Sequence, residues 1–192
     1  MAFDLNGFLS ISWDEYFRLV NKLADEIIKS NKRYDRIVGI TRAGLTLGHF
    51  LSDVLSLPIS VFTIKSYSDI EKQETVEITE KLIADIKAKD ILLVDELADT
   101  GKTFKKAIEY LQKKKPKSIT TGAVFYKPHS IYKPDFYVET TDKWVLLPYE
   151  FTENAILLKK MLDGENREVE SNLLKLGYKK NDLKLLKSRG II

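Results

Sequence analysis

The order of apolar and polar positions along this chain predicts strands that alternate with helices. After Ser12, a typical capping residue, apolar side chains recur every three or four positions, as on one face of a helix. The same spacing predicts helices over residues 45–55 and 104–112. Short apolar or alternating runs predict the strands. These expected strands cover residues 35–40, 59–64, 75–79, 91–94, 118–126, 136–139 and 144–147.

This alternation predicts an α/β fold with a mostly parallel sheet, because parallel strands need long crossover connections. Ligands of such sheets bind beyond the carboxyl ends of the strands. A turn at residues 41–44 and the segment 95–103 both follow strands, so we expect them to form one site. Residues 65–74 are polar and aperiodic, which predicts a mobile loop.

The pattern changes after residue 150, so we expect a core of residues 1–150 and an extension of residues 151–192. Gly164 and Gly177 separate three short helical patterns in the extension, and Asn181 is the expected cap of the last one. The expected helices cover residues 154–162, 165–176 and 181–188. Packing or dimerisation is the simplest role for this helical bundle, and closure over the site is the alternative.

Composition narrows the chemistry. Among 192 residues, 44% are hydrophobic and 31% charged, as in soluble globular proteins. The net charge of +3 does not require a nucleic-acid partner, and we expect none. No secretory signal or transmembrane run is apparent, which predicts a cytoplasmic protein without a membrane partner. The absence of cysteine excludes disulfides and thiolate catalysis.

Metal chemistry is also restricted. The two histidines, His49 and His129, are too few and too far apart in sequence for a usual zinc site. A metal should therefore be a hard ion bound by oxygen, most simply Mg²⁺ shared with a phosphate substrate.

The strongest chemical signal is the segment 91–103. Four apolar residues lead into Asp95 and Glu96, and Asp-Thr-Gly-Lys-Thr ends the segment. Carboxylates at a strand end can accept hydrogen bonds from ribose hydroxyls, and a loop before a helix can bind phosphate through its N–H groups. The last three residues also match a Walker A loop. That loop requires a glycine where Glu96 stands, so we exclude it.

This segment resembles the signature of the type I phosphoribosyltransferases, which bind 5-phosphoribosyl-1-pyrophosphate (PRPP). Residues 41–45 resemble the pyrophosphate loop of that family. Lys127 with residues 134–138 and 144–150 resembles the base-binding end of the purine members, most closely the short archaeal 6-oxopurine group. The resemblance covers about residues 10–150 and implies the fold of that family, with a C-terminal helical bundle added.

The implied reaction joins a purine base to PRPP with Mg²⁺, giving a nucleoside monophosphate and pyrophosphate in purine salvage. A homodimer is usual in the family. The resemblance implies ribose and phosphate binding by Asp95, Glu96, Ala98, Asp99, Thr100, Gly101, Lys102 and Thr103. It implies pyrophosphate binding by Thr41, Arg42, Ala43 and Gly44, a mobile loop with Lys65, Ser66 and Tyr67, and base binding by Lys127, Trp144, Val145 and Glu150.

Two of these residues are the implied catalytic groups. Asp99 would handle a proton near N7 of the base, and its alternative role is a helix cap. Arg42 would hold pyrophosphate through its planar guanidinium, and its alternative is a plain surface arginine. Relatives often have a cis peptide in this loop beside glycine, from which Ala43 departs. Metal contacts are expected mainly through substrate oxygens, with Asp95 and Glu96 as further candidates.

Two features of the sequence indicate different bases. A lysine donor at position 127 suits the carbonyl of a 6-oxopurine such as hypoxanthine, guanine or xanthine. The helical extension resembles that of an archaeal subgroup that uses adenine, and on that ground the sequence narrowly favours adenine. A different class of function, a regulator that binds PRPP without turnover, uses the same fold. Retention of Arg42, Asp95, Glu96 and Asp99 favours an enzyme.

Overall fold

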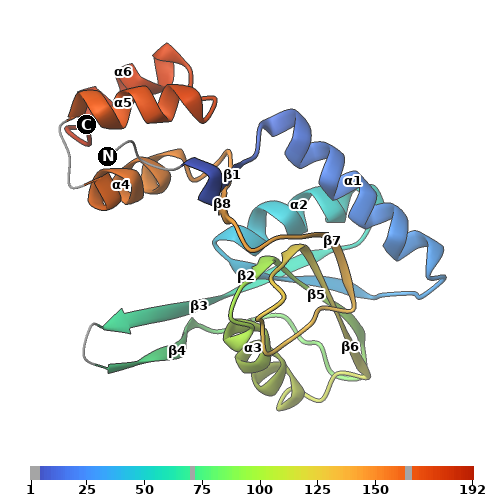
Figure 1. The fold of residues 1–192 in the computed structure, drawn as a ribbon. Coiled ribbons are helices and arrows are strands. Elements are labelled where there is room, and N and C mark those ends of the chain that lie inside the picture. Colours follow the sequence, from blue (N-terminus) through green and yellow to red (C-terminus); the bar gives the residue numbers. More distant parts are fainter. Residues whose placement is uncertain (1–4, 70–71, 163–165) are drawn as a thin grey trace. The chain divides into compact units, whose positions relative to one another are not determined.

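We describe a computed structural model that covers residues 5–69, 72–162 and 166–192. The chain forms two compact units, which are described in turn (Figure 1). One unit is Arg18–Asp142. The other combines Met1–Phe17 with Lys143–Ile192.

The larger unit is built on a six-stranded sheet of order β4-β3-β2-β5-β6-β7. All neighbouring pairs are parallel except β3 with β4, so the expected mostly parallel sheet is confirmed. Four central residues of β5 are fully buried, because helices cover both faces of such a sheet. The strands are β2 (Arg36–Thr41), β3 (Ile59–Asp69), β4 (Lys72–Glu80), β5 (Asp90–Ala98), β6 (Ser118–Tyr126) and β7 (Phe136–Thr140).

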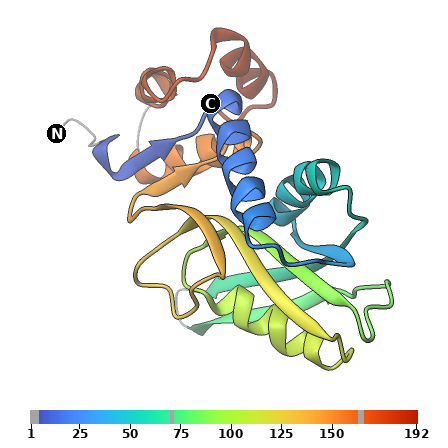
Figure 2. The same cartoon turned by 90° about the vertical axis from the view of Figure 1, so that its right-hand side faces the viewer.

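Helices α2 (Ala43–Leu55) and α3 (Lys102–Gln112) lie on opposite faces of this sheet (Figure 2). On the α3 side, Phe104 and Ala107 pack with Val38 and Leu93 in one buried cluster. Helix α1 (Trp13–Lys29) begins after Ser12, whose Oγ accepts a hydrogen bond from the N–H of Glu15 at 3.2 Å. The predicted cap of this helix is therefore confirmed.

The prediction of a loop at residues 65–74 is wrong for most of this segment. Residues Lys65–Asp69 continue β3, and Lys72–Glu74 begin β4, in an antiparallel hairpin that extends away from the rest of the sheet (Figure 1). The polar composition misled because β4 is the edge strand and the part of β3 beyond Thr63 pairs with β4 alone. Side chains at a sheet edge need not be apolar. Residues 70–71 lie outside the described residues.

The smaller unit joins the two ends of the chain. Strand β1 (Phe8–Ser10) follows a short 3₁₀ helix, η1 (Leu5–Gly7), and pairs in parallel with β8 (Trp144–Leu146). Three helices follow as expected, α4 (Phe151–Leu162), α5 (Asn166–Lys175) and α6 (Lys180–Ser188). A buried cluster fixes them to the strand pair. It contains Phe8, Leu146, Ala155, Leu158, Val169, Leu173, Leu183, Leu186 and Ile192.

Glycine ends α5 as predicted, but the cap of α6 is not Asn181. Gly177 has a positive φ of 94°, which suits the residue after a helix. Helix α6 begins one residue earlier than expected. The N–H of Lys179 donates to Asp182 Oδ2 at 2.7 Å, so Asp182 fixes the first turn. The predicted break at Gly164 lies outside the described residues.

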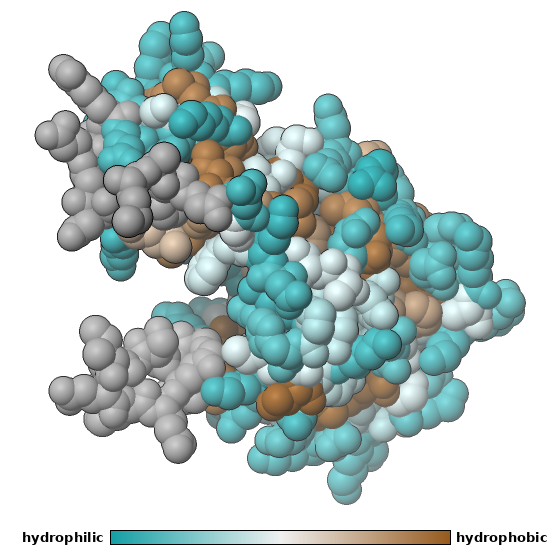
Figure 3. All heavy atoms as spheres, viewed as in Figure 1, coloured by the Kyte–Doolittle hydropathy of each residue, from teal (hydrophilic) through white to brown (hydrophobic). Residues whose placement is uncertain are grey.

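No helix within residues 5–69, 72–162 and 166–192 is long and apolar enough to cross a membrane. Hydrophilic side chains cover much of the face shown in Figure 3, and apolar ones appear in separate patches.

Candidate active site

The predicted pyrophosphate loop follows β2 and packs closely on β5. A Cβ atom at Gly44 would stand 2.5 Å from the carbonyl oxygen of Val94 and 3.3 Å from Cα of Asp95. A Cβ atom at Gly39 would stand 2.6 Å from the carbonyl oxygen of Gly44. The two glycines therefore let the start of α2 approach the strand that carries the acid pair.

The peptide bond between Thr41 and Arg42 is cis, and the Arg42 side chain is exposed. The sequence left this bond open because Ala43 stands where glycine is common, and the cis form found in many relatives is present. Thr41 Oγ1 lies 2.6 Å from Thr63 Oγ1, and Thr63 in turn donates a hydrogen bond to the Glu80 carboxylate. This chain of hydroxyls connects the loop to the base of the β3–β4 hairpin.

The acid pair lies inside a strand rather than after it. Strand β5 extends through Ala98, because Leu97 and Ala98 still pair with residues of β6. Asp95 is half-buried, and its Oδ1 accepts a hydrogen bond from the N–H of Glu96 at 2.9 Å. The Glu96 side chain is only 1% exposed. Of the two acids, Asp95 is therefore the one available to a ligand in this structure.

The phosphate loop is the short turn between β5 and α3. Gly101 precedes α3 with φ of 79°, and no side chain caps the helix there. The N–H of Lys102 lies 3.4 Å from Thr100 Oγ1, while the side chain of Lys102 is exposed. The first N–H groups of a helix have no partner within the helix, so this start can bind an anion. Ala98 and Thr103, also predicted here, are buried and half-buried.

Asp99 contacts two basic side chains. Its Oδ1 lies 3.3 Å from Nζ of Lys127 and 3.1 Å from Nε2 of His129. The Lys127 side chain is 9% exposed, whereas those of Asp99 and His129 are 47% and 56% exposed. Since no side chain caps α3, the alternative of Asp99 as its cap is not supported.

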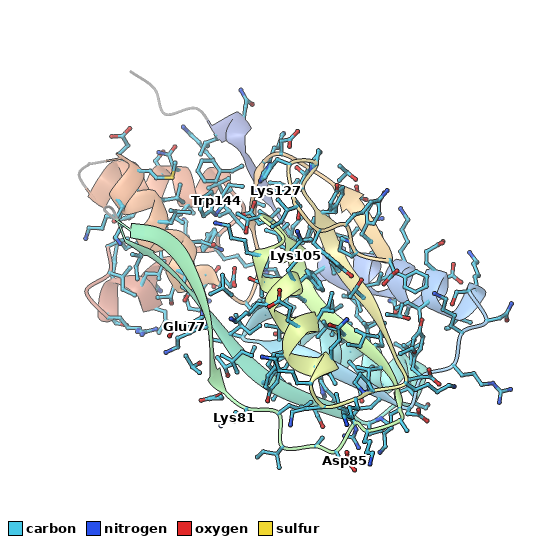
Figure 4. The ribbon with its side chains drawn as sticks, turned by 90° about the horizontal axis from the view of Figure 1, so that it is seen from below. Glu77, Lys81, Asp85, Lys105, Lys127 and Trp144 are labelled. Carbon is cyan, nitrogen blue, oxygen red and sulfur yellow. The ribbon has the colours of Figure 1, made fainter. Side chains whose placement is uncertain are left out.

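Sequence reasoning missed His129 as a site residue. It considered the two histidines only as zinc ligands. The available signal was its position two residues after Lys127, just beyond the carboxyl end of β6. Figure 4 marks Lys127 at this end of the strand.

The predicted base-stacking residue belongs to the smaller unit. Trp144, labelled in Figure 4, begins β8 and is 49% exposed, so it is not a core tryptophan. Val145 beside it is buried, and Glu150 is half-buried just before α4. Tyr149 packs against Tyr16, with ring centroids 5.5 Å apart and nearly perpendicular rings.

Residues of the predicted mobile loop lie in β3, where Ser66 pairs with Val76 and Tyr67 with Thr75. The side chain of Lys65 is exposed, and those of Ser66 and Tyr67 lie outside the described part of the structure. Within the described residues, no group of three or more His, Asp or Glu side chains is arranged to hold a metal ion.

Comparison with known proteins agrees with this geometry. Residues 12–154 match the phosphoribosyl transferase domain. A xanthine-guanine phosphoribosyltransferase of Idiomarina loihiensis is 26% identical over 153 residues, 78% of this chain and 91% of that protein. The transcriptional regulator GfcR of Methanococcus maripaludis is 28% identical over 108 residues, and this chain spans only 52% of it.

A solved structure has the same fold. The purine phosphoribosyltransferase of Pyrococcus horikoshii superposes with a TM-score of 0.68 at 32% identity, over 74% of this chain and 94% of that one. The family match includes the cis-peptide loop, the acid pair and the loop before α3. The chain therefore belongs to the type I phosphoribosyltransferases, which are pentosyltransferases.

Proposed function

We propose that this chain transfers the phosphoribosyl group of PRPP to a purine base, forming a nucleoside 5′-monophosphate and pyrophosphate in purine salvage. The observation that carries this proposal is the buried Lys127 directly after β6, paired with Asp99 at the start of the phosphate loop. These two side chains suit a heterocycle that has both a carbonyl group and an N–H group. The lysine donates to the carbonyl, and the carboxylate accepts from the N–H.

Each part of the site then has one task. The N–H groups of residues 98–103 and the hydroxyls of Thr100 and Thr103 bind the 5′-phosphate. Asp95 accepts hydrogen bonds from the ribose hydroxyls, and its charge favours the positive charge that grows on the sugar as the bond to pyrophosphate breaks. Arg42 holds the pyrophosphate through its guanidinium fork.

Mg²⁺ fits this set of groups, since the ligands on offer are oxygens of carboxylates and of the substrate. Its oxygens would come mainly from PRPP, with Asp95 as the accessible carboxylate of the chain. The ion would neutralise charge on the departing pyrophosphate. We propose a cytoplasmic homodimer as the working form.

The base that fits the local chemistry best is a 6-oxopurine. Lys127 would donate to O6, and Asp99 would accept the N–H at N7, which must lose its proton when N9 bonds to the sugar. The xanthine-guanine enzyme among the relatives supports this choice. It replaces the narrow preference for adenine that the sequence alone suggested.

Adenine stays the second candidate because of one observation. Helices α5 and α6 lie beyond the family match, which ends at residue 154. This extension resembles that of archaeal adenine enzymes. It has no part in the contacts proposed for a 6-oxopurine.

Product formation decides between these functions. The protein is incubated with Mg²⁺ and PRPP and, in parallel, with hypoxanthine, guanine, xanthine or adenine, using Arg42→Ala as the impaired control. IMP, GMP or XMP supports the 6-oxopurine proposal, and AMP alone supports the adenine candidate. PRPP binding without any product overturns the enzyme proposal and favours a regulator, the class to which the partial GfcR match points.

A further inference from the structure

His129 is a second donor to the carboxylate that handles the base. We propose that His129 is a positioning residue for phosphoribosyl transfer, which holds Asp99 so that its second oxygen faces the purine N–H. The inference rests on the proposed function. It adds a residue that neither the sequence motifs nor the proposed chemistry required.

The backbone brings His129 to Asp99. The N–H of Lys127 donates to the carbonyl oxygen of Ala98 at 3.1 Å, and the N–H of Ile131 donates to that of Thr100 at 3.0 Å. These two bonds flank Asp99 on one segment and His129 on the other. The contact between the two side chains therefore follows from the attachment of the segment 127–131, named here the basic loop, to the phosphate loop.

Packing at the other end of the basic loop fixes it further. The ring of Tyr132 stacks on Phe104 of α3, with centroids 5.4 Å apart and planes 18° apart. A Cβ atom at Gly101 would stand 2.5 Å from Ser130 Oγ and from the N–H nitrogen of Tyr132. The basic loop and the start of α3 are therefore in direct contact, which limits how far His129 can move.

The two carboxylate oxygens of Asp99 differ in their contacts. Both recorded partners, Lys127 and His129, approach Oδ1. An ionised carboxylate only accepts hydrogen bonds, so Nε2 of His129 is the donor whether the imidazole is neutral or charged. In the proposed complex, Oδ2 accepts the N–H at N7 of the base while both donors contact Oδ1.

His129 matters most when substrate is bound. In the proposed complex, Lys127 donates hydrogen bonds both to O6 of the base and to Asp99. His129 makes no such second contact in the proposed reaction, so it keeps Asp99 oriented while Lys127 turns to the base. Because Asp99 and His129 are both about half exposed, the contribution should be modest.

Steady-state kinetics of the full chain test the role. His129→Ala should lower kcat about three- to fivefold, since exposed ion pairs contribute at most about 1 kcal/mol. The KM for PRPP should stay unchanged, because the proposed binding of PRPP does not involve His129. His129→Gln should stay within about twofold of wild type, because its amide nitrogen can replace Nε2 as a donor. The control is His49→Ala, on the exposed side of α2.

Ring NMR signals of the two histidines provide a test without turnover. Asp99→Asn should shift the signals of His129 and leave those of His49 in place. Unchanged His129 signals, an unchanged kcat in His129→Ala, or equal loss in the Ala and Gln variants would each overturn the inference while the proposed function stands. Wild-type protein that makes no nucleotide with any base would overturn the proposed function, and the inference with it.

Discussion

At the scale of single residues, Gly101 connects the two loops of the site. Its φ of 79° is unfavourable for other residues, and a Cβ atom there would meet Ser130 and Tyr132 at 2.5 Å. We expect Gly101→Ala to lower stability by about 1–3 kcal/mol and kcat/KM by tenfold or more. Urea unfolding and product formation measure both effects.

The matched control is Gly7→Ala, because no atom lies within 4 Å of a Cβ built at Gly7. It should change the free energy of unfolding by less than about 0.5 kcal/mol. If Gly101→Ala behaved like this control, the close contact between the basic loop and α3 would not constrain the site.

In the proposed reaction, Asp99 takes the proton of the base. Asp99→Asn keeps the shape of the side chain but removes its capacity to take a proton, so kcat should fall by about 10²-fold or more. PRPP affinity, measured by calorimetry, should change little. A variant with near-normal turnover would show that Asp99 only supports the loop.

In the proposed site, Arg42 binds the pyrophosphate and not the 5′-phosphate. Arg42→Ala should weaken PRPP and pyrophosphate by about tenfold or more and nucleoside monophosphate much less, since only the first two place a pyrophosphate on the cis-peptide loop. Titration with all three ligands measures this difference. Equal weakening of the three would remove Arg42 from the pyrophosphate site.

At the scale of elements, the spacing of apolar residues predicted the helices and strands whose bounds depend on nearby residues. Strand β6 was predicted at its observed bounds, and the expected helices appear within a few residues. The extra residues of β3 and β5 could not be predicted, because they are extended only by pairing with β4 and β6. His129 was missed for a related reason, since its partner Asp99 is 30 residues away in sequence.

The sequence motif predicted which residues belong to the site but not how buried each one is. Position in the motif identified Asp95, Glu96 and Asp99 alike. Burial then distinguishes them, with Glu96 at 1% exposed and the Asp99 side chain at 47%. A spacing rule carries no information on which carboxylate faces inward, because that depends on how far β5 continues along β6.

The end of α5 offers a pH-dependent test. Burial raises the pKa of Tyr178 to about 12, from an ordinary value of 10.0. A raised pKa in the folded state means that the associated stability is complete below about pH 10 and is lost as the pH rises toward 12. The melting temperature of wild type should therefore fall more steeply in this window than that of Tyr178→Phe, by at least about 2 °C. Parallel curves for the two proteins would contradict the buried phenol.

At the scale of the whole molecule, the smaller unit is assembled from both ends of the chain. Strand β1, near the start, pairs with β8, and Ser10 Oγ donates to the carbonyl oxygen of Leu176 at 2.6 Å, 166 residues later. Such long-range contacts carry a large loop-closure entropy, which the buried cluster around Phe8 and Leu146 must offset. The helices of the extension therefore depend on residues at the opposite end of the sequence.

Phe8→Ala tests this dependence. Phe8 is 8% exposed and packs in the cluster with Leu146, Leu158 and Leu173, so its truncation should cost about 3–5 kcal/mol. Hydrogen exchange should then speed up in β8 and in α4–α6, far from the substitution in sequence. Phe104→Ala, an equally large deletion in the cluster of the Arg18–Asp142 unit, should speed exchange in α3 and β5. Unchanged exchange in the C-terminal helices of Phe8→Ala would mean that they hold together without the N-terminal strand.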